Sequence, residues 1–126
     1  MIPSDLKYTK EHEWVKLVNN TAVIGITDYA AGELGDVVFV EMPKVGAKVQ
    51  QMKAFGTIEA VKAISDLFSP ISGEVVEVNS DVANEAAVIN QDPYGKGWII
   101  KVKLSNTGEL SSLLSAADYE ALIKKS

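Results

Sequence analysis

The chain has no cysteine and only one histidine among its 126 residues. The missing thiols exclude disulfides, iron–sulfur clusters, cysteine-based zinc sites and a thiol nucleophile. A single histidine, His12, also excludes a histidine-rich metal site. We therefore expect no metal site, no catalytic residue and no enzyme activity of the chain's own, since little catalytic machinery remains. Redox chemistry, if the protein takes part in any, must be brought in on a cofactor.

The sequence also lacks a basic cluster and a long apolar run. Its 12 basic residues are all lysines, scattered among 17 acidic residues, and the net charge is −5. Nucleic-acid binding depends on clustered Lys and Arg, so none is expected. No apolar run approaches the roughly 18 residues that span a bilayer, and the start of the chain has neither a signal-peptide pattern nor an Arg-rich leader. We expect a cytoplasmic monomer without membrane contact, or a mitochondrial protein if this is a mature organellar form.

Short runs of strand type separated by closely spaced turns predict a mainly β fold. The length fits one domain with a hydrophobic core, so we expect a single domain over residues 1–126. A hairpin is predicted at Asn19-Asn20, and Asp28 is expected to cap a helical turn that ends near Gly35. The expected strands are 13–18, 21–26, 36–41, 45–51, 54–60, 73–79, 87–90 and 97–104.

The C-terminal part changes to helical spacing. Helices are predicted at 109–114 and 115–125, and together they form the C-terminal helices at about 109–125, packed on the β unit. Ser115 and Asp118 are arranged as a capping box, while Lys124 and Lys125 suit the negative end of a helix dipole.

Two segments of the chain are alike. Residues 35–40 and 73–78 each contain a glycine, an acid and Val-Val-x-Val in the same order, which suggests two related half-units. Lys62 lies between them, in a segment whose own residues favour helix and strand about equally. The flanks at 54–58 and 68–73 favour extended structure and a sharp exit.

The segment Glu59-Ala60-Val61-Lys62-Ala63 resembles the lipoyl-attachment hairpin of the H proteins of the glycine cleavage system. The resemblance continues, in the family's order, over most of the chain. The matching pieces are 8–15, 25–30, 34–40, 59–63, 69–75 and 90–98.

The resemblance implies a flattened β-barrel/sandwich hybrid of the lipoyl/biotinyl-carrier type with short C-terminal helices. It places Lys62 at the tip of a tight turn between two strands, where lipoic acid is attached as an amide. The implied role is a non-catalytic carrier in glycine catabolism. Glycine decarboxylase, a pyridoxal-phosphate enzyme, loads an aminomethyl group onto the arm; aminomethyltransferase passes the carbon to tetrahydrofolate, and dihydrolipoamide dehydrogenase reoxidises the arm. A lipoate ligase or lipoyl transferase is a further implied partner.

The resemblance also implies roles for neighbouring side chains. Glu13 is the expected acceptor for the cationic amine of the loaded arm, with Asp66 nearby, in a cleft that limits water. Glu59 and Asp66 flank Lys62 as a recognition handle for the ligase.

Four further residues bear on the expected cleft and its surroundings. His12 is expected to be positional, contacting a loop or Trp14, while Trp14 and Trp98 pack. The chain departs from some relatives at Glu11, where they carry a small hydroxyl residue, and at Glu33, where they carry histidine. Both positions are expected near the cleft.

Other readings remain open at this stage. Biotin carriers typically flank the target lysine with methionines, whereas Lys62 lies between Val61 and Ala63; lipoyl domains of 2-oxoacid dehydrogenases typically carry Asp-Lys-Ala and flexible linkers. An H-like protein that relays lipoate to other acceptors fits the same residues. An unmodified β interaction domain is the remaining alternative.

Overall fold

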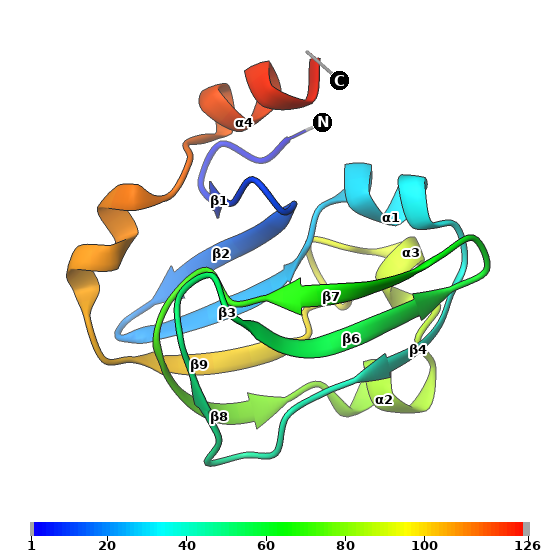
Figure 1. The fold of residues 1–126 in the computed structure, drawn as a ribbon, viewed down its shortest axis with the longest axis horizontal. Helices are drawn as coiled ribbons and strands as arrows, with labels where there is room; N and C mark the ends of the chain where they lie inside the picture. The colour runs from blue at the N-terminus through cyan, green and yellow to red at the C-terminus, as the bar shows by residue number, and fades with distance from the viewer. Residues whose placement is uncertain (1, 125–126) are drawn as a thin grey trace.

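The computed structural model describes residues 2–124 as two antiparallel sheets packed face to face, with short helices around them (Figure 1). The larger sheet has the order β1-β2-β3-β9-β8-β5 and the smaller has the order β4-β6-β7. The predicted mainly β fold is confirmed, and because neither order closes on itself, the two sheets form a sandwich and not a closed barrel. The strands are β1 (Lys7–Tyr8), β2 (Glu13–Val18), β3 (Thr21–Ile26), β4 (Val37–Glu41), β5 (Lys48–Val49), β6 (Ala54–Ala60), β7 (Ile64–Phe68), β8 (Gly73–Val78) and β9 (Ile100–Leu104).

The inner faces of both sheets form one hydrophobic core. Ile24 and Val102 enter it from the larger sheet, and Val40, Ile58 and Leu67 enter it from the smaller sheet. Strand alternation sends every second side chain inward, which explains why such short apolar runs fill a shared interior.

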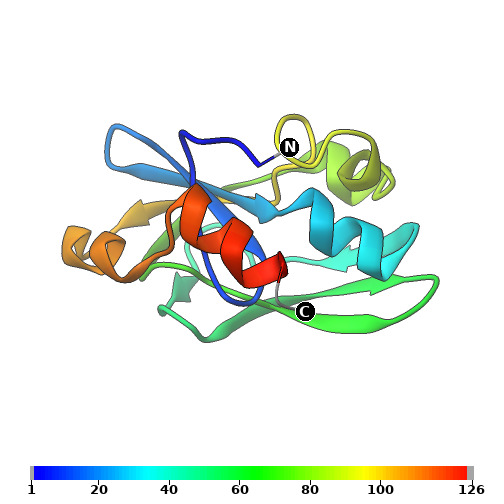
Figure 2. The same ribbon diagram turned by 90° about the horizontal axis from the view of Figure 1, so that it is seen from above.

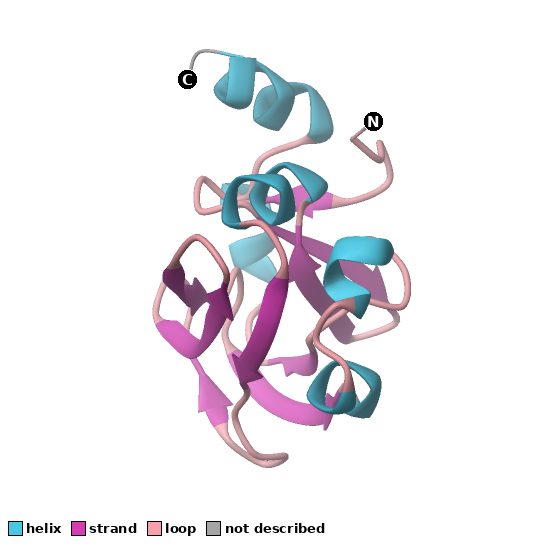
Figure 3. Cartoon of the chain, turned by 90° about the vertical axis from the view of Figure 1, so that its right-hand side faces the viewer, coloured by secondary structure: helices cyan, strands magenta, loops and turns pink. Residues whose placement is uncertain are grey.

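Four α-helices and one 3-10 helix cover the ends of the sheets, as the side view shows (Figure 3). Four of these helices begin at a side-chain cap: Thr27 accepts from the Ala30 N–H, Asn79 from the Asp81 N–H, Asn106 from the Gly108 N–H and Ser115 from the Asp118 N–H. The helices are α1 (Asp28–Leu34), α2 (Ser80–Asn84), α3 (Val88–Gln91), η1 (Thr107–Ser112) and α4 (Ala116–Lys124).

Four sequence predictions are wrong in detail, and one of them is the strand expected at 97–104, which begins only at Ile100. The expected strand 87–90 is instead the N-cap Ala87 and the first three residues of helix α3 (Val88–Gln91), because a short apolar run fits either structure and here it packs beside α1 and α2. The predicted strand 45–51 is reduced to Lys48–Val49, since Gly46 has a φ of 95° and turns the chain. Thr27, one residue before Asp28, supplies the cap of α1.

Helix α4 packs across the N-terminal part of the chain (Figure 2). The Tyr119 ring stacks on Tyr8 with centroids 4.8 Å apart, and both side chains are fully buried. The Ser115 hydroxyl accepts from the Asp118 N–H, which is the N-cap bond of the predicted capping box. Lys125, the end of the predicted helix, lies outside the described residues.

Candidate functional site

The Lys62 segment is a β-hairpin. Strands β6 and β7 pair in antiparallel register up to Glu59 and Ile64, and the Ala60 N–H donates to the Ala63 carbonyl at 2.9 Å. Val61, Lys62 and Ala63 form the turn, and all three are exposed. The hairpin tip lies at one end of the long axis of the molecule (Figure 1). The structure therefore displays the Lys62 side chain at a protruding turn between two strands.

The turn is fixed from outside by the segment that joins α1 to β4. The Val61 N–H donates to the Asp36 carbonyl at 2.9 Å, and the Lys62 N–H donates to the Leu34 carbonyl at 3.3 Å. Between these carbonyls lies Gly35, which ends α1 with φ 80° and ψ −160°, a region of backbone space that is essentially restricted to glycine. The amine of Lys62 thus extends from a turn with two backbone anchors.

Gly35 also makes room for the aliphatic part of the Lys62 side chain, from Cγ to Cε. A Cβ at position 35 would lie 3.3 Å from the Lys62 Cγ, tighter than an ordinary contact. We expect Gly35→Ala to lower the free energy of unfolding by about 2 kcal/mol, mainly through backbone strain. Urea denaturation measures this.

Gly32 offers a matched control within the same helix. A Cβ there meets nothing within 4 Å, so Gly32→Ala should stabilise the protein by about 0.5–1 kcal/mol through helix propensity. A Gly35→Ala variant as stable as wild type would contradict the strain argument.

A cleft of about 210 Å³ lies beside this turn. One wall is strand β7, at the edge of the smaller sheet, and the other is formed by the start of β2, the end of β3 and helix α1. Leu34 connects the two features, because it lines the cleft and its carbonyl accepts from the Lys62 N–H. The walls combine acids with apolar side chains. Acidic residues in the lining are Glu11, Glu13, Glu33 and Asp66, and apolar ones include Ile26, Leu34, Ile58 and Leu67.

Glu13 is the buried acid of the cleft, with an exposed fraction of 2%. Its carboxylate accepts from the Thr9 hydroxyl at 2.6 Å and from the Phe68 N–H on the edge of β7 at 3.2 Å. Burial raises the pKa of Glu13 to about 8, and these two donors only partly oppose it. Glu13 is therefore a proton-binding group held at the cleft wall, not a solvated strand acid.

His12 contacts helices α1 and α4 rather than Trp14. Its Nδ1 lies 2.7 Å from the Tyr119 hydroxyl, which also lies 2.7 Å from the Thr27 hydroxyl. The His12 ring centroid is 5.1 Å from that of Tyr29. Burial lowers the pKa of His12, so the ring is a neutral wall of the cleft near pH 7.

The two tryptophans both make packing contacts. Trp14 is buried and its indole N–H donates to the Pro93 carbonyl at 2.9 Å. Trp98 lies under the Lys101 amine, 4.7 Å from the ring centroid.

The two acids that flank Lys62 in sequence lie in different places. Asp66 is exposed at the border of the cleft. Glu59 pairs with Phe39 on one side and Ile64 on the other, in the row next to Ile58. Glu59 is not among the residues that line the cleft, whereas its neighbour Ile58 is. The structure therefore gathers Glu13 and Asp66, together with Glu11 and Glu33, but not Glu59.

Sequence reasoning missed the groups that hold these residues in place. Thr9 orients Glu13, and the Leu34 and Asp36 carbonyls hold the turn. Thr9 lies within the matching piece 8–15, so its place next to Glu13 could have been predicted from the resemblance. The backbone carbonyls were not, because their direction depends on tertiary structure.

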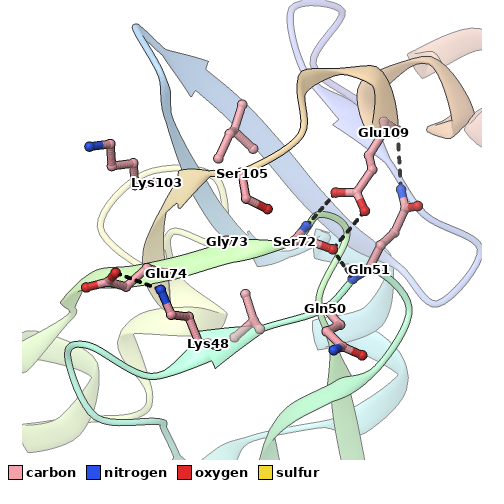
Figure 4. Close-up of a pocket in the computed structure, with 11 residues that line it drawn as sticks. Lys48, Gln50, Gln51, Ser72, Gly73, Glu74, Lys103, Ser105 and Glu109 are labelled. Carbon is pink, nitrogen blue, oxygen red and sulfur yellow. Dashed lines mark hydrogen bonds and ion pairs between the residues drawn. The ribbon is translucent and has the colours of Figure 1, made fainter.

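A second, wider hollow does not include Lys62 and is lined by Lys48, Ser72, Glu74 and Glu109, among others (Figure 4). Its volume is about 720 Å³. The Glu109 carboxylate accepts from the Ser72 N–H at 2.6 Å and from the Ser72 hydroxyl at 2.7 Å, and Lys48 pairs with Glu74 at 3.1 Å. The Glu109–Ser72 bonds fasten η1 to the start of β8, and the Lys48–Glu74 pair joins β5 to β8.

Residues 2–124 contain no group of three His, Cys, Asp or Glu side chains placed to hold a metal ion. Over the same described range, no helix has the length and apolarity needed to cross a membrane.

Comparison with known proteins gives consistent matches over nearly the whole chain. The family model described as "Glycine cleavage H-protein" matches residues 6–126. The glycine cleavage system H protein of Chlorobaculum parvum is 58% identical over 124 residues, 97% of each chain. That of Carboxydothermus hydrogenoformans is 53% identical over 125 residues, covering 99% of this chain and 96% of the relative. The crystal structure of a glycine cleavage system H protein from Mycobacterium marinum superposes with a TM-score of 0.91 at 37% identity, covering 98% of this chain and 99% of that one.

Proposed function

This chain belongs to the glycine cleavage H-protein family, and we propose that it is a single-domain lipoyl carrier whose arm is attached to Lys62. One observation carries the proposal above all others. Lys62 lies in an exposed turn that two backbone hydrogen bonds hold in place, and one of the two acceptors is the carbonyl of Leu34, which also lines the acidic cleft. A rigid, protruding lysine is what an acylating enzyme needs, and the adjacent cleft gives the attached arm a place to dock.

The cleft fits a lipoyl group by its chemistry. Apolar side chains such as Ile58 and Leu67 suit the hydrocarbon part of such an arm, and the acids suit a cationic amine at its end. When bound, the lipoyl group supplies a dithiolane that takes up a one-carbon amine and two electrons. The protein supplies the anchor, the binding surface and the exclusion of water.

Glu13 is the residue we propose for holding the cargo amine, with Asp66 at the cleft border. A cation next to Glu13 stabilises its ionised form against the burial that raises its pKa to about 8. Docking of the amine near pH 7 therefore releases a proton from Glu13. Glu11 and Glu33 add negative charge to the same cleft, which strengthens the attraction of a cationic cargo relative to cleft walls without them.

The proposal includes the partners that the family name implies. Glycine decarboxylase, aminomethyltransferase and dihydrolipoamide dehydrogenase each act on the same tethered arm, so the intermediate stays at high effective concentration near each site. A lipoate ligase or lipoyl transferase attaches the arm. The bacterial origin of the relatives supports a cytoplasmic setting for this chemistry.

Reconstitution tests this function. Lipoylated chain mixed with the three partner enzymes, glycine, tetrahydrofolate and NAD should give glycine-dependent NAD reduction, and the unmodified chain should give none. A carrier that only relays lipoate to other acceptors would be lipoylated yet would not sustain NAD reduction. That outcome would contradict the glycine cleavage role.

A further inference from the structure

Helix α3 holds the segment that anchors the Lys62 turn, through the side chain of Asn90. The Asn90 Nδ2 donates to the Gly35 carbonyl at 2.9 Å, and its Oδ1 accepts from the Val37 N–H at 2.8 Å. The amide thus bridges the two peptide groups on either side of Asp36. Such a contact needs a donor and an acceptor on one short side chain, which an asparagine amide provides.

The carbonyls of this segment point alternately to the hairpin and to α3. Those of Leu34 and Asp36 accept from the Lys62 and Val61 N–H groups, while that of Gly35 accepts from Asn90. Helix α3 and the hairpin tip therefore form hydrogen bonds with the same run of three peptide groups. Because these carbonyls belong to three consecutive planar peptide groups, a displacement of the peptide that Asn90 holds also displaces its two neighbours.

Loss of the Asn90 amide leaves the Val37 N–H without its acceptor, at a position that water cannot easily reach. Val37 is 3% exposed and begins β4, where it pairs with Ala60 at the end of β6. With its N–H unpaired, this start of β4 shifts toward another partner or toward solvent, because a buried donor without a partner is unfavourable. Its displacement moves the carbonyls that hold Val61 and Lys62.

We propose that Asn90 is a positioning residue for Lys62, fixing the display of the turn through the α1–β4 segment. The inference rests on the proposed lipoylation of Lys62. Once the turn is released, only a fraction of the molecules hold it in the conformation that the ligase binds. The apparent affinity of the ligase for the protein falls in proportion to that fraction. The maximal rate, set once the turn is bound, changes little.

The experiment compares Asn90→Ala with Asn79→Ala in the full chain. Asn79 is a matched control, since its Nδ2 donates to the Lys96 and Trp98 carbonyls at 2.8 and 2.6 Å and its Oδ1 accepts from the Asp81 N–H. It clamps a loop to α2 and has no bond to the hairpin or to its anchor. Asn90→Asp keeps the acceptor and loses the donor, so it should lie between wild type and Asn90→Ala.

Two readouts are taken on each variant. Amide hydrogen exchange at Val61 and Lys62 should accelerate about tenfold or more in Asn90→Ala and stay at the wild-type rate in Asn79→Ala. With lipoate ligase, the KM for the protein should rise about tenfold in Asn90→Ala with kcat within a factor of two. Exchange at β3 amides reports global stability and separates an unfolding effect from a local one.

Unchanged exchange at Val61 and Lys62 in Asn90→Ala would overturn the proposal, as would an equal rise in KM for Asn79→Ala. Absence of lipoylation in the wild-type chain would instead contradict the proposed function. Because the exchange measurement needs no ligase, it decides the role of Asn90 in the backbone even then.

Discussion

Lys62→Arg should abolish both lipoylation and glycine-dependent NAD reduction in the reconstituted system. Arginine keeps the positive charge and most of the length of lysine, so the hairpin is unaffected. Its guanidinium stays protonated in proteins and offers no free amine for acylation. We expect the loss to be complete rather than partial, because the other lysines of the chain do not lie at this turn.

Lys53→Arg is the matched control. Lys53 is exposed and directly precedes β6, at the base of the same hairpin. This variant should be lipoylated and should support NAD reduction at the wild-type rate. A lipoyl mass on Lys62→Arg, or an inactive Lys53→Arg that is normally folded, would contradict the assignment of the arm to Lys62.

Glu13→Gln should remove a large pH dependence of stability. The pKa of Glu13 rises from 4.5 to about 8 in the folded state because the carboxyl is buried. The native state therefore binds more protons than the unfolded state between these values, and its stability falls as pH rises. The stability that the native state gains by binding this proton on Glu13 is fully present below the unfolded pKa and is lost as pH rises through about 8.

The expected size is on the order of 4 kcal/mol between about pH 5 and pH 9. We measure the free energy of unfolding of wild type and Glu13→Gln by urea titration at several pH values. As pH rises, the free energy of unfolding of Glu13→Gln should increase relative to that of wild type. His12 and the other cleft acids, Glu11, Glu33 and Asp66, are present in both proteins, so their own titration largely cancels. A difference that stays flat over this range would contradict the raised pKa.

The absolute stability of Glu13→Gln is a separate quantity. Both oxygens of the Glu13 carboxyl, which is protonated at about pH 5, lie next to donors, namely the Thr9 hydroxyl and the Phe68 N–H. A glutamine amide places its NH₂ group next to one of these donors, and this group cannot accept a hydrogen bond. We therefore expect some loss of stability at about pH 5, of about 1–2 kcal/mol. The pH dependence, and not the value at one pH, reports the burial of the charge.

The strands of the larger sheet were predictable because their apolar residues face one buried side. The hairpin of 13–18 and 21–26 formed as the Asn19-Asn20 turn predicts. Residues 87–90 show the limit of this reasoning. A run of four residues with buried Ile89 near its centre is compatible with a strand as well as with a helix. Only its packing beside α1 determines that it is helical. Asn90 was thereby placed on the wrong element by sequence reasoning.

The position of Glu13 could be predicted, but its burial could not. Regular alternation along β2 would expose either Glu13 or Trp14, yet Glu13, Trp14 and Val15 are all buried. The start of this strand is covered on both sides, by the β7 edge over Glu13 and by α4 and the loop of Pro93 around Trp14. Such double coverage comes from segments distant in sequence, and so do the raised pKa and the anchoring of the Lys62 turn.

Peptide mass mapping of the wild-type chain after incubation with lipoate ligase and lipoate tests the central claim most directly. Digestion after acidic residues should place one lipoyl mass on the peptide that contains Lys62 and none on the peptides of the other lysines. A folded chain that remains unmodified, or that carries the lipoyl group on another lysine while Lys62 stays free, would contradict the account.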